Sequence, residues 1–242
     1  MDITAVGIAP NLSWLTQRLS AHGYTVIKGH LPATLLSNHP DINVLSYLLI
    51  DNCVISIGEH SSIALEWLVT QSSRHHLQYA ELTGKWHPAG VQFGFMLFLG
   101  TTIETCTTLQ ALLDTLAPLP EAWLYCGPAG SASFTHRVFN ALTCTSGLAL
   151  QTEFDTRIPP LLQKGWVHTL MQQQQTLATQ LLMLAETYLA HHPVSHSIDT
   201  NTSQTFHALP YLSKKHPHYA HALAELLVLA LGATTGCSTS KN

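Results

Sequence analysis

Short apolar runs alternate with an amphipathic stretch at the start of the chain. Residues 3–9 are almost entirely apolar, which is typical of a short buried strand. Asn11 can cap a helix that runs to about His22, because Leu12, Leu15 and Leu19 share one helix face. Gly23 ends this helix, and residues 24–28 indicate a second strand. The order strand, helix, strand predicts a β-α-β unit.

The segment over residues 30–50 is shorter than the corresponding part of a full dinucleotide-binding domain. Residues 31–36 fit one or two helix turns, and residues 43–50 predict a strand. A full dinucleotide-binding domain carries further strand and helix material at this place. We therefore expect a truncated form of such a domain.

The second half of the chain has a helical pattern. Residues 158–191 repeat their leucines at helical spacing and predict one long helix, with Gly165 as a point of interruption. Residues 192–204 are polar and predict a loop, residues 206–212 are ambiguous, and residues 219–231 predict another apolar helix. Residues 232–242 predict a frayed tail. An α/β first half followed by an α-helical second half is the expected organisation.

Composition excludes several function classes. Of 242 residues, 46% are hydrophobic, so a sizeable core can form, and the formal net charge of −4 gives no electrostatic case for nucleic acid or an anionic membrane. Five cysteines lie far apart, which favours free thiols in a reducing compartment. The histidine cluster near Lys214 lacks acidic or thiolate ligands, so we expect no metal site. No signal peptide or membrane span is recognisable, and we expect a soluble cytoplasmic protein.

A glycine-rich turn precedes the helical half. Gly127 and Gly130 permit backbone angles that a Cβ would forbid, and Pro128 between them fixes φ. His136 and Asn140 follow four residues apart, so they share one face of the helix that begins here. Such a turn can hold an anionic substrate at the helix N-terminus, and the alternative is an ordinary helix cap with a polar face.

The same turn carries residues shared with a known family. The matching positions are Cys126, Gly127, Pro128, Gly130, Phe134 and Asn140. The match extends without gaps over residues 54–151, including the strand that ends in Glu81 and the glycines at 90, 94 and 100. In these residues the chain resembles the 6-phosphogluconate dehydrogenase family of the β-hydroxyacid dehydrogenase superfamily.

The resemblance implies a fold, a cofactor and a reaction. The fold class is α/β, with a truncated Rossmann-like N-terminal domain over residues 1–124 and an all-α C-terminal domain over residues 125–242. Family members oxidise and decarboxylate a sugar acid with NADP, and their helical domains pack into homodimers. NADP or NAD is therefore the implied cofactor.

The chain departs from the family where the chemistry is done. His136 stands in place of the catalytic lysine, Thr143 in place of the proton-donating glutamate, and Asn140 is kept. The substrate-binding Ser-Gly-Gly loop aligns with Lys85, Trp86 and His87, and we expect Trp86 to fill space that a substrate needs. The candidate catalytic residues are thus His136 and Asn140, and the candidate substrate-binding residues are Lys85, His87, Gly127 and Gly130.

The dinucleotide fingerprint is incomplete. Gly7, Ala9 and Leu12 align with its three glycines, and Leu12 is expected to obstruct the close crossing of helix and strand. No acidic residue ends the second strand, where Lys28 and His30 suit a 2′-phosphate instead. The candidate cofactor-binding residues are Gly7, Ala9, Lys28 and His30, and a unit that no longer binds dinucleotide is the alternative.

Two functions follow from these observations. The first is a 6-phosphogluconate dehydrogenase-like Rossmann protein that has lost this chemistry and acts as a dimeric binding or scaffold protein. The second is a divergent NAD(P)-dependent oxidoreductase acting on a small hydroxy acid, in which His136 is the general base and Asn140 orients the substrate.

Overall fold

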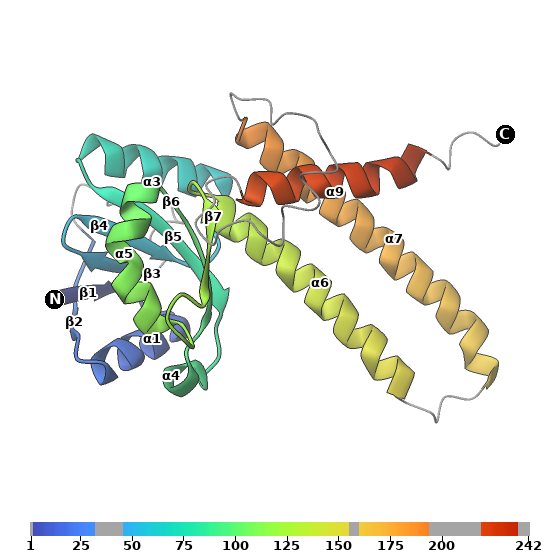
Figure 1. Ribbon diagram of the computed structural model, residues 1–242, viewed down its shortest axis with the longest axis horizontal. Helices are drawn as coiled ribbons and strands as arrows, with labels where there is room; N and C mark the ends of the chain where they lie inside the picture. Colours follow the sequence, from blue (N-terminus) through green and yellow to red (C-terminus); the bar gives the residue numbers. More distant parts are fainter. Residues whose placement is uncertain (1, 32–45, 155–159, 194–218, 237–242) are drawn as a thin grey trace. The chain divides into compact units, whose positions relative to one another are not determined.

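A computed structural model describes residues 2–31, 46–154, 160–193 and 219–236 of the chain. It divides into two compact units (Figure 1). The first unit runs to Ser133 and includes Tyr219 and Ala220, and the second takes the described residues from Phe134 and from His221 onward. The division falls inside the first turn of a helix, and the predicted domain boundary after Leu124 stays a prediction.

The first unit is built on one seven-stranded mixed sheet of order β2-β1-β3-β4-β5-β6-β7. The strands are β1 (Asp2–Val6), β2 (Thr25–Lys28), β3 (Ser46–Ile50), β4 (Cys53–Ile57), β5 (Gln78–Lys85), β6 (Met96–Thr101) and β7 (Trp123–Gly127). Its helices are α1 (Pro10–Ala21), α3 (Ser62–Arg74), α4 (Gly90–Phe93) and α5 (Ile103–Leu116). The predicted α/β class with a Rossmann-like opening is confirmed, because β1 and β2 are parallel and joined by α1.

The helix α1 begins two residues earlier than predicted. Ala9 is the N-cap and Pro10 takes the first turn, where its missing N–H and fixed φ are harmless. Asn11 lies inside the helix, and its side chain accepts a hydrogen bond from the N–H of Leu12 at 3.0 Å. The expectation that Asn11 caps the helix is therefore wrong. Gly23 ends the segment as predicted, with a φ of 89°.

The segment over residues 30–50 ends in a hairpin. β3 and β4 pair in an antiparallel manner up to Ile50 and Cys53, so only Asp51 and Asn52 connect them. Asp51 has a φ of 47°, as a two-residue hairpin turn requires. A two-residue connection reverses the chain, so β3 and β4 are antiparallel. β3 also runs opposite to β1, where a doubly wound sheet would continue parallel. The helix predicted over 31–36 lies outside the described residues.

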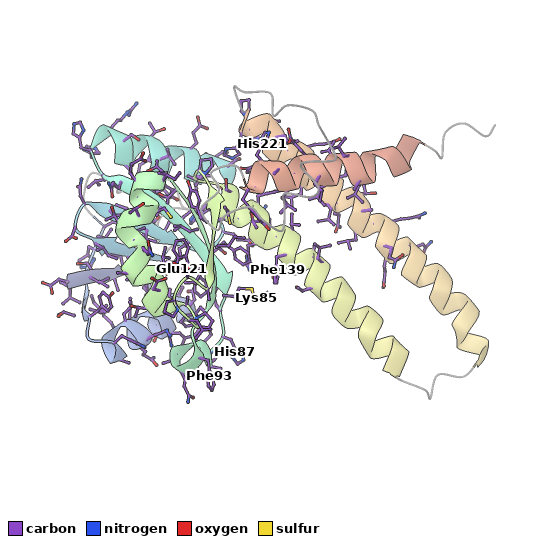
Figure 2. All side chains as sticks on the ribbon, in the orientation of Figure 1. Lys85, His87, Phe93, Glu121, Phe139 and His221 are labelled. Carbon is purple, nitrogen blue, oxygen red and sulfur yellow. The ribbon has the colours of Figure 1, made fainter. Side chains whose placement is uncertain are left out.

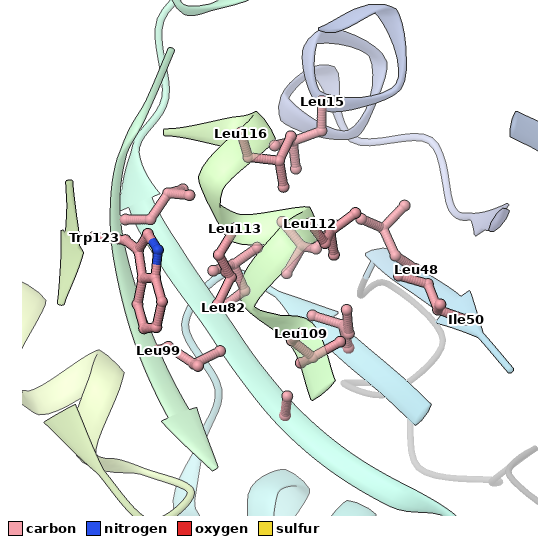
Figure 3. Close-up of a cluster of buried hydrophobic side chains, with 14 of the residues drawn as sticks. Leu15, Leu48, Ile50, Leu82, Leu99, Leu109, Leu112, Leu113, Leu116 and Trp123 are labelled. Carbon is pink, nitrogen blue, oxygen red and sulfur yellow. The ribbon is translucent and has the colours of Figure 1, made fainter. Parts of the chain in front are cut away.

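Both faces of the sheet are covered, because every residue of β4 is buried and its side chains alternate between two apolar clusters. One cluster joins the sheet to the leucine faces of α1 and α5, as Figure 3 shows for Leu15, Leu112 and Leu116 beside Leu48 and Leu82. The other joins Tyr47, Val54 and Tyr79 to α3. Leu12, expected to obstruct the crossing of helix and strand, belongs to the first cluster at 5% exposure.

The helices of the second half are α6 (Ser131–Phe154), α7 (Pro160–His191) and α9 (Tyr219–Gly236). The predicted long helix is confirmed as α7, and Gly165 does not interrupt it. The helix predicted over 219–231 is confirmed and extends to Gly236. The polar loop beyond residue 193 and the ambiguous segment at 206–212 lie outside the described residues. No helix in the described parts of the chain has the length and apolar character needed to cross a membrane.

Candidate functional site

The loop between β1 and α1 is open to solvent. Gly7 has a φ of 115°, which lets the chain turn sharply at the end of β1. Gly7 and Pro10 are exposed and Ile8 is 99% exposed. The N-cap residue Ala9 offers no side-chain acceptor, and no acidic residue stands in the first turn of α1. The positive end of this helix dipole is thus free of any carboxylate of its own helix.

Lys28 and His30 lie beside this loop. Lys28 is the last residue of β2 and pairs with Ala5 of β1, two positions before Gly7. Gly29 donates its N–H to the carbonyl of Ala5 at 3.0 Å, which holds the end of β2 against β1. Both Lys28 and His30 have exposed side chains. The structure therefore brings all four predicted cofactor-binding residues to one end of the β1-α1-β2 unit.

The glycine-rich turn before α6 is different, because a carboxylate already occupies its helix N-terminus. Glu81 of β5 is fully buried, and its Oε2 accepts the N–H of Gly130 at 2.9 Å. Its Oε1 accepts the hydroxyl of Ser133 in a short hydrogen bond, and the backbone N–H groups of Ala132 and Ser133 also donate to this carboxyl. The groups that were expected to hold an anionic substrate are thus satisfied within the protein.

Burial and hydrogen bonding have opposite effects on the pKa of the Glu81 carboxyl. Burial raises the pKa of the Glu81 carboxyl, and the hydrogen bonds from Ser133 and Gly130 oppose this shift. Gly100 on β6 leaves room for the carboxylate, since a Cβ there would lie 2.9 Å from Oε2 of Glu81. This carboxyl is a structural anchor for the first turn of α6. Gly127, with a φ of 128°, completes the turn, and a role for it in substrate binding stays a prediction.

The candidate substrate residues of β5 lie at the other end of that strand. Lys85 is its last residue and is exposed, and His87 follows in the loop to α4, where its Nδ1 accepts the N–H of Ala89 at 3.2 Å (Figure 2). Trp86 between them turns inward against the apolar cluster, and its ring centroid lies 5.6 Å from that of Phe95. A substrate-binding role for Lys85 and His87 stays a prediction.

The predicted catalytic pair is formed within the second unit. His136 and Asn140 are one turn apart on α6, and Nδ2 of Asn140 lies 3.0 Å from Nε2 of His136. The His136 side chain is 8% exposed. The two side chains are thus within hydrogen-bond distance of one another, and their catalytic role stays a prediction.

Sequence reasoning missed a buried polar chain on the α3 side of the sheet. Nε2 of His60 lies 2.7 Å from Oγ of Ser56, which lies 2.7 Å from the hydroxyl of Tyr79. Desolvation lowers the pKa of His60 to about 4, although the nearby charge of Glu59 opposes this shift. The spacing of Ser56 and His60 carries no motif, so only the fold reveals the contact. Among the described residues, no group of three or more His, Cys, Asp or Glu side chains could hold a metal ion.

Comparison with known proteins gives likeness of fold only. No protein-family model matches the chain, and no curated protein matches it. Among solved structures, the imine reductase of Myxococcus stipitatus in complex with NADP+ is 15% identical, with a TM-score of 0.45, covering 95% of this chain and 94% of that one. An imine reductase from Pseudomonas sp. is 13% identical, with a TM-score of 0.48 and coverage of 96% and 94%. These identities assign the chain to no family.

Proposed function

We propose that this chain is a 6-phosphogluconate dehydrogenase-like Rossmann protein that binds an NADP-type nucleotide and no longer carries out 6-phosphogluconate chemistry. The open N-terminus of α1 carries this proposal. Two helix N-termini were candidates for an anion, and that of α6 is occupied by the buried carboxyl of Glu81. The other, behind Gly7 and Ala9, is exposed and has no carboxylate of its own.

The charges around the open loop favour a nucleotide with an additional phosphate. A phosphate at the start of α1 would gain the favourable end of the helix dipole, which no acidic residue of the first turn offsets. Lys28 stands at the end of β2, where an acidic residue would otherwise bind a ribose hydroxyl. A lysine at this position favours a 2′-phosphate, and His30 adds a second donor.

Loss of the family reaction is supported by the residues that replace its machinery. The resemblance puts His136 where the family has its lysine, and the imidazole is shorter than a lysine side chain and lies 3.0 Å from the amide of Asn140. Trp86, in place of a small residue, packs on Phe95. Thr143 cannot deliver an acidic proton near neutral pH, and its hydroxyl donates to the carbonyl of Phe139 at 2.9 Å. Decarboxylation of a sugar acid needs such a donor.

Titration calorimetry with NADP+ and NAD+ tests the binding proposal. The wild-type chain should bind NADP+ more tightly than NAD+, and Lys28→Glu should weaken NADP+ by about tenfold or more, since a charge-assisted hydrogen bond contributes roughly 1.5–3 kcal/mol. Arg74→Glu is the matched control, because Arg74 is also an exposed cation that ends its element. Equal affinities of the Lys28→Glu and Arg74→Glu proteins would overturn the role of Lys28.

A second candidate is an NAD(P)-dependent oxidoreductase that acts on a small hydroxy acid. The observation that favours it is the buried imidazole of His136, which lies within hydrogen-bond distance of Asn140, so that a base and an orienting amide stand side by side. A screen of hydroxy acids with NADP+ and wild-type protein tests this candidate. Turnover that disappears in His136→Ala would establish it in place of the binding protein.

We further propose that the chain works as a homodimer through its helical half, as the resemblance implies. Light scattering on the purified protein at several concentrations tests this. A mass of twice 26.5 kDa supports the dimer, and a mass of 26.5 kDa at all concentrations removes it.

A further inference from the structure

A buried hydroxyl without a hydrogen-bond partner lies at the edge of the sheet where β1 ends. Ser46 is 1% exposed, and among the described residues no group is within hydrogen-bond distance of its Oγ. Removing a hydroxyl from water without a partner costs free energy, so buried polar groups in folded proteins are nearly always hydrogen-bonded. The Ser46 hydroxyl therefore needs a partner that the described residues do not supply.

The strand register places Ser46 beside the loop between β1 and α1. Ser46 is the first residue of β3, where the next residue, Tyr47, pairs with Val6 at the end of β1. On its other side Ser46 pairs with Ile57, the last residue of β4. Neighbouring strands lie about 4.8 Å apart, so Ser46 is one strand away from the turn that begins at Gly7.

Ser46 also lies on the face of the sheet that α1 covers. Side chains alternate along a strand, so Ser46 and Leu48 point to the same face. Leu48 belongs to the apolar cluster that contains Leu12 and Leu15 of α1, and Figure 3 shows it among these side chains. Ile57, the partner of Ser46 on β4, belongs to the same cluster. The unpaired hydroxyl is therefore on the side of the sheet from which α1 starts.

We propose that the Ser46 hydroxyl donates a hydrogen bond to the pyrophosphate of a nucleotide bound at the N-terminus of α1. This role rests on the proposed nucleotide binding and adds a contact from β3 to that site. Phosphate oxygens accept hydrogen bonds, and a serine hydroxyl has one proton to donate. The hydroxyl and the helix dipole, which no acidic residue of the first turn offsets, then act on the same anion.

This contact gives Ser46 a different part in recognition from that of Lys28. The pyrophosphate is common to NADP+ and NAD+, so the Ser46 hydroxyl contributes equally to the binding of both. Lys28 is assigned to the 2′-phosphate, which NAD+ lacks. The two residues can therefore be told apart by comparing the two nucleotides.

The absence of a partner in the ligand-free protein has a consequence for its stability. Ser46→Ala removes a buried hydroxyl that makes no hydrogen bond there, so the melting temperature without ligand should stay unchanged or rise. In the nucleotide complex the same change removes a hydrogen bond to a charged group, which should weaken binding by about tenfold or more. Stability and affinity therefore do not fall together.

Ser72 provides a matched control. It is also 1% exposed, and among the described residues its Oγ has no hydrogen-bond partner either. It lies in the last turn of α3, where its carbonyl accepts the N–H of Leu77 just before β5 begins. Because β1, β4 and β5 run in the same direction, this is the opposite edge of the sheet from Gly7. Ser72→Ala should leave the affinity for both nucleotides unchanged.

Calorimetric titration of wild type, Ser46→Ala and Ser72→Ala with NADP+ and with NAD+ tests the role of Ser46, together with thermal melts of the ligand-free proteins. Ser46→Ala should weaken both nucleotides by the same factor, whereas Lys28→Glu should act on NADP+ more than on NAD+. A loss confined to NADP+ in Ser46→Ala would contradict the pyrophosphate contact.

Two further outcomes separate this role from the proposed function itself. Equal affinities of the Ser46→Ala and Ser72→Ala proteins, or a ligand-free Ser46→Ala protein that melts well below wild type, would overturn the role of Ser46 while nucleotide binding by wild type remains. A wild-type protein that binds neither nucleotide would overturn the proposed function, and the role of Ser46 with it.

Discussion

The carboxylate of Glu81 accepts a hydrogen bond from the hydroxyl of Ser133, although the two residues are 52 positions apart in the chain. Glu81 on β5 thereby caps the first turn of α6 and joins it to the sheet. Truncation by Glu81→Ala would leave the Ser133 hydroxyl and the N–H groups of Gly130, Ala132 and Ser133 buried without an acceptor. We expect a loss of about 3 kcal/mol in the free energy of unfolding, measured by urea denaturation.

Glu81→Gln distinguishes the charge of this cap from its shape. Because burial raises the pKa of Glu81, the ionised form is disfavoured by folding, and its contribution to stability decreases as the pH rises from 4.5 through the folded value. The amide keeps an acceptor oxygen and does not titrate. Glu81→Gln should therefore cost less than Glu81→Ala at pH 7 and should flatten this pH dependence. A Gln variant as unstable as the Ala variant would show that the negative charge itself is needed.

The buried imidazole of His60 should make the protein acid-sensitive. Its pKa of about 4 lies below the ordinary value of 6.5, so the unfolded chain takes up a proton first and stability falls as the pH drops from 6.5 towards 4. The difference corresponds to about 3 kcal/mol. Urea unfolding of wild type and His60→Gln at pH 7 and pH 4.5 measures it, since other histidines cancel in the comparison. If wild type and His60→Gln lost the same free energy of unfolding between pH 7 and pH 4.5, His60 would not be the cause of the acid sensitivity.

Gly94 and Gly23 offer a matched pair for testing the packing between α4 and the end of α5. Both have positive φ, 88° and 89°, so alanine is strained at each position. At Gly94 a Cβ would also lie 2.3 Å from the backbone N of Pro118, whereas at Gly23 it meets nothing within 4 Å. Gly23→Ala should cost about 1 kcal/mol and Gly94→Ala about 3 kcal/mol or more. Equal melting temperatures for the two variants would show that the backbone at Pro118 can move away from the added Cβ without loss of stability.

Arg18 of α1 ties this helix to α4 and to the end of α5. Its guanidinium donates to the carbonyls of Thr115 at 2.7 Å and Ala117 at 2.8 Å, and to those of Val91 and Gln92. Arg18→Met keeps the apolar stem and leaves these carbonyls unsatisfied, so we expect a loss of about 3 kcal/mol. Gln17→Met, at an exposed neighbour on α1, is the control and should change the unfolding midpoint little.

The spacing of apolar residues was enough to predict those helices and strands that depend on residues close together in the sequence. The opening strand, α1 and β2 follow from the spacing of Leu12, Leu15 and Leu19 and from Gly23, and α7 follows from its leucine repeat. The helix start was misplaced because Pro10 suits the first turn better than Asn11 suits the cap. The direction of β3 depends on the two-residue turn at Asp51, which periodicity does not reveal.

The site was predictable only where its residues are close in sequence. Asn140 could be placed beside His136 because four residues make one helix turn, and Lys28 beside the loop at Gly7 because β1 and β2 are consecutive. The cap that Glu81 places on α6 could not be foreseen, since it joins residues 52 positions apart. That contact decides which helix N-terminus remains open to a ligand, and only the fold supplies it.

Nucleotide binding without the sugar-acid reaction can be tested in a single experiment. Wild-type protein is titrated with NADP+ in a calorimeter, and 6-phosphogluconate is then added while the absorbance of reduced nicotinamide is followed. We expect saturable binding with a dissociation constant of roughly micromolar size, about −8 kcal/mol, and no reduction of NADP+. Absence of binding up to about 1 mM, about −4 kcal/mol, or formation of NADPH on addition of the sugar acid, would contradict it.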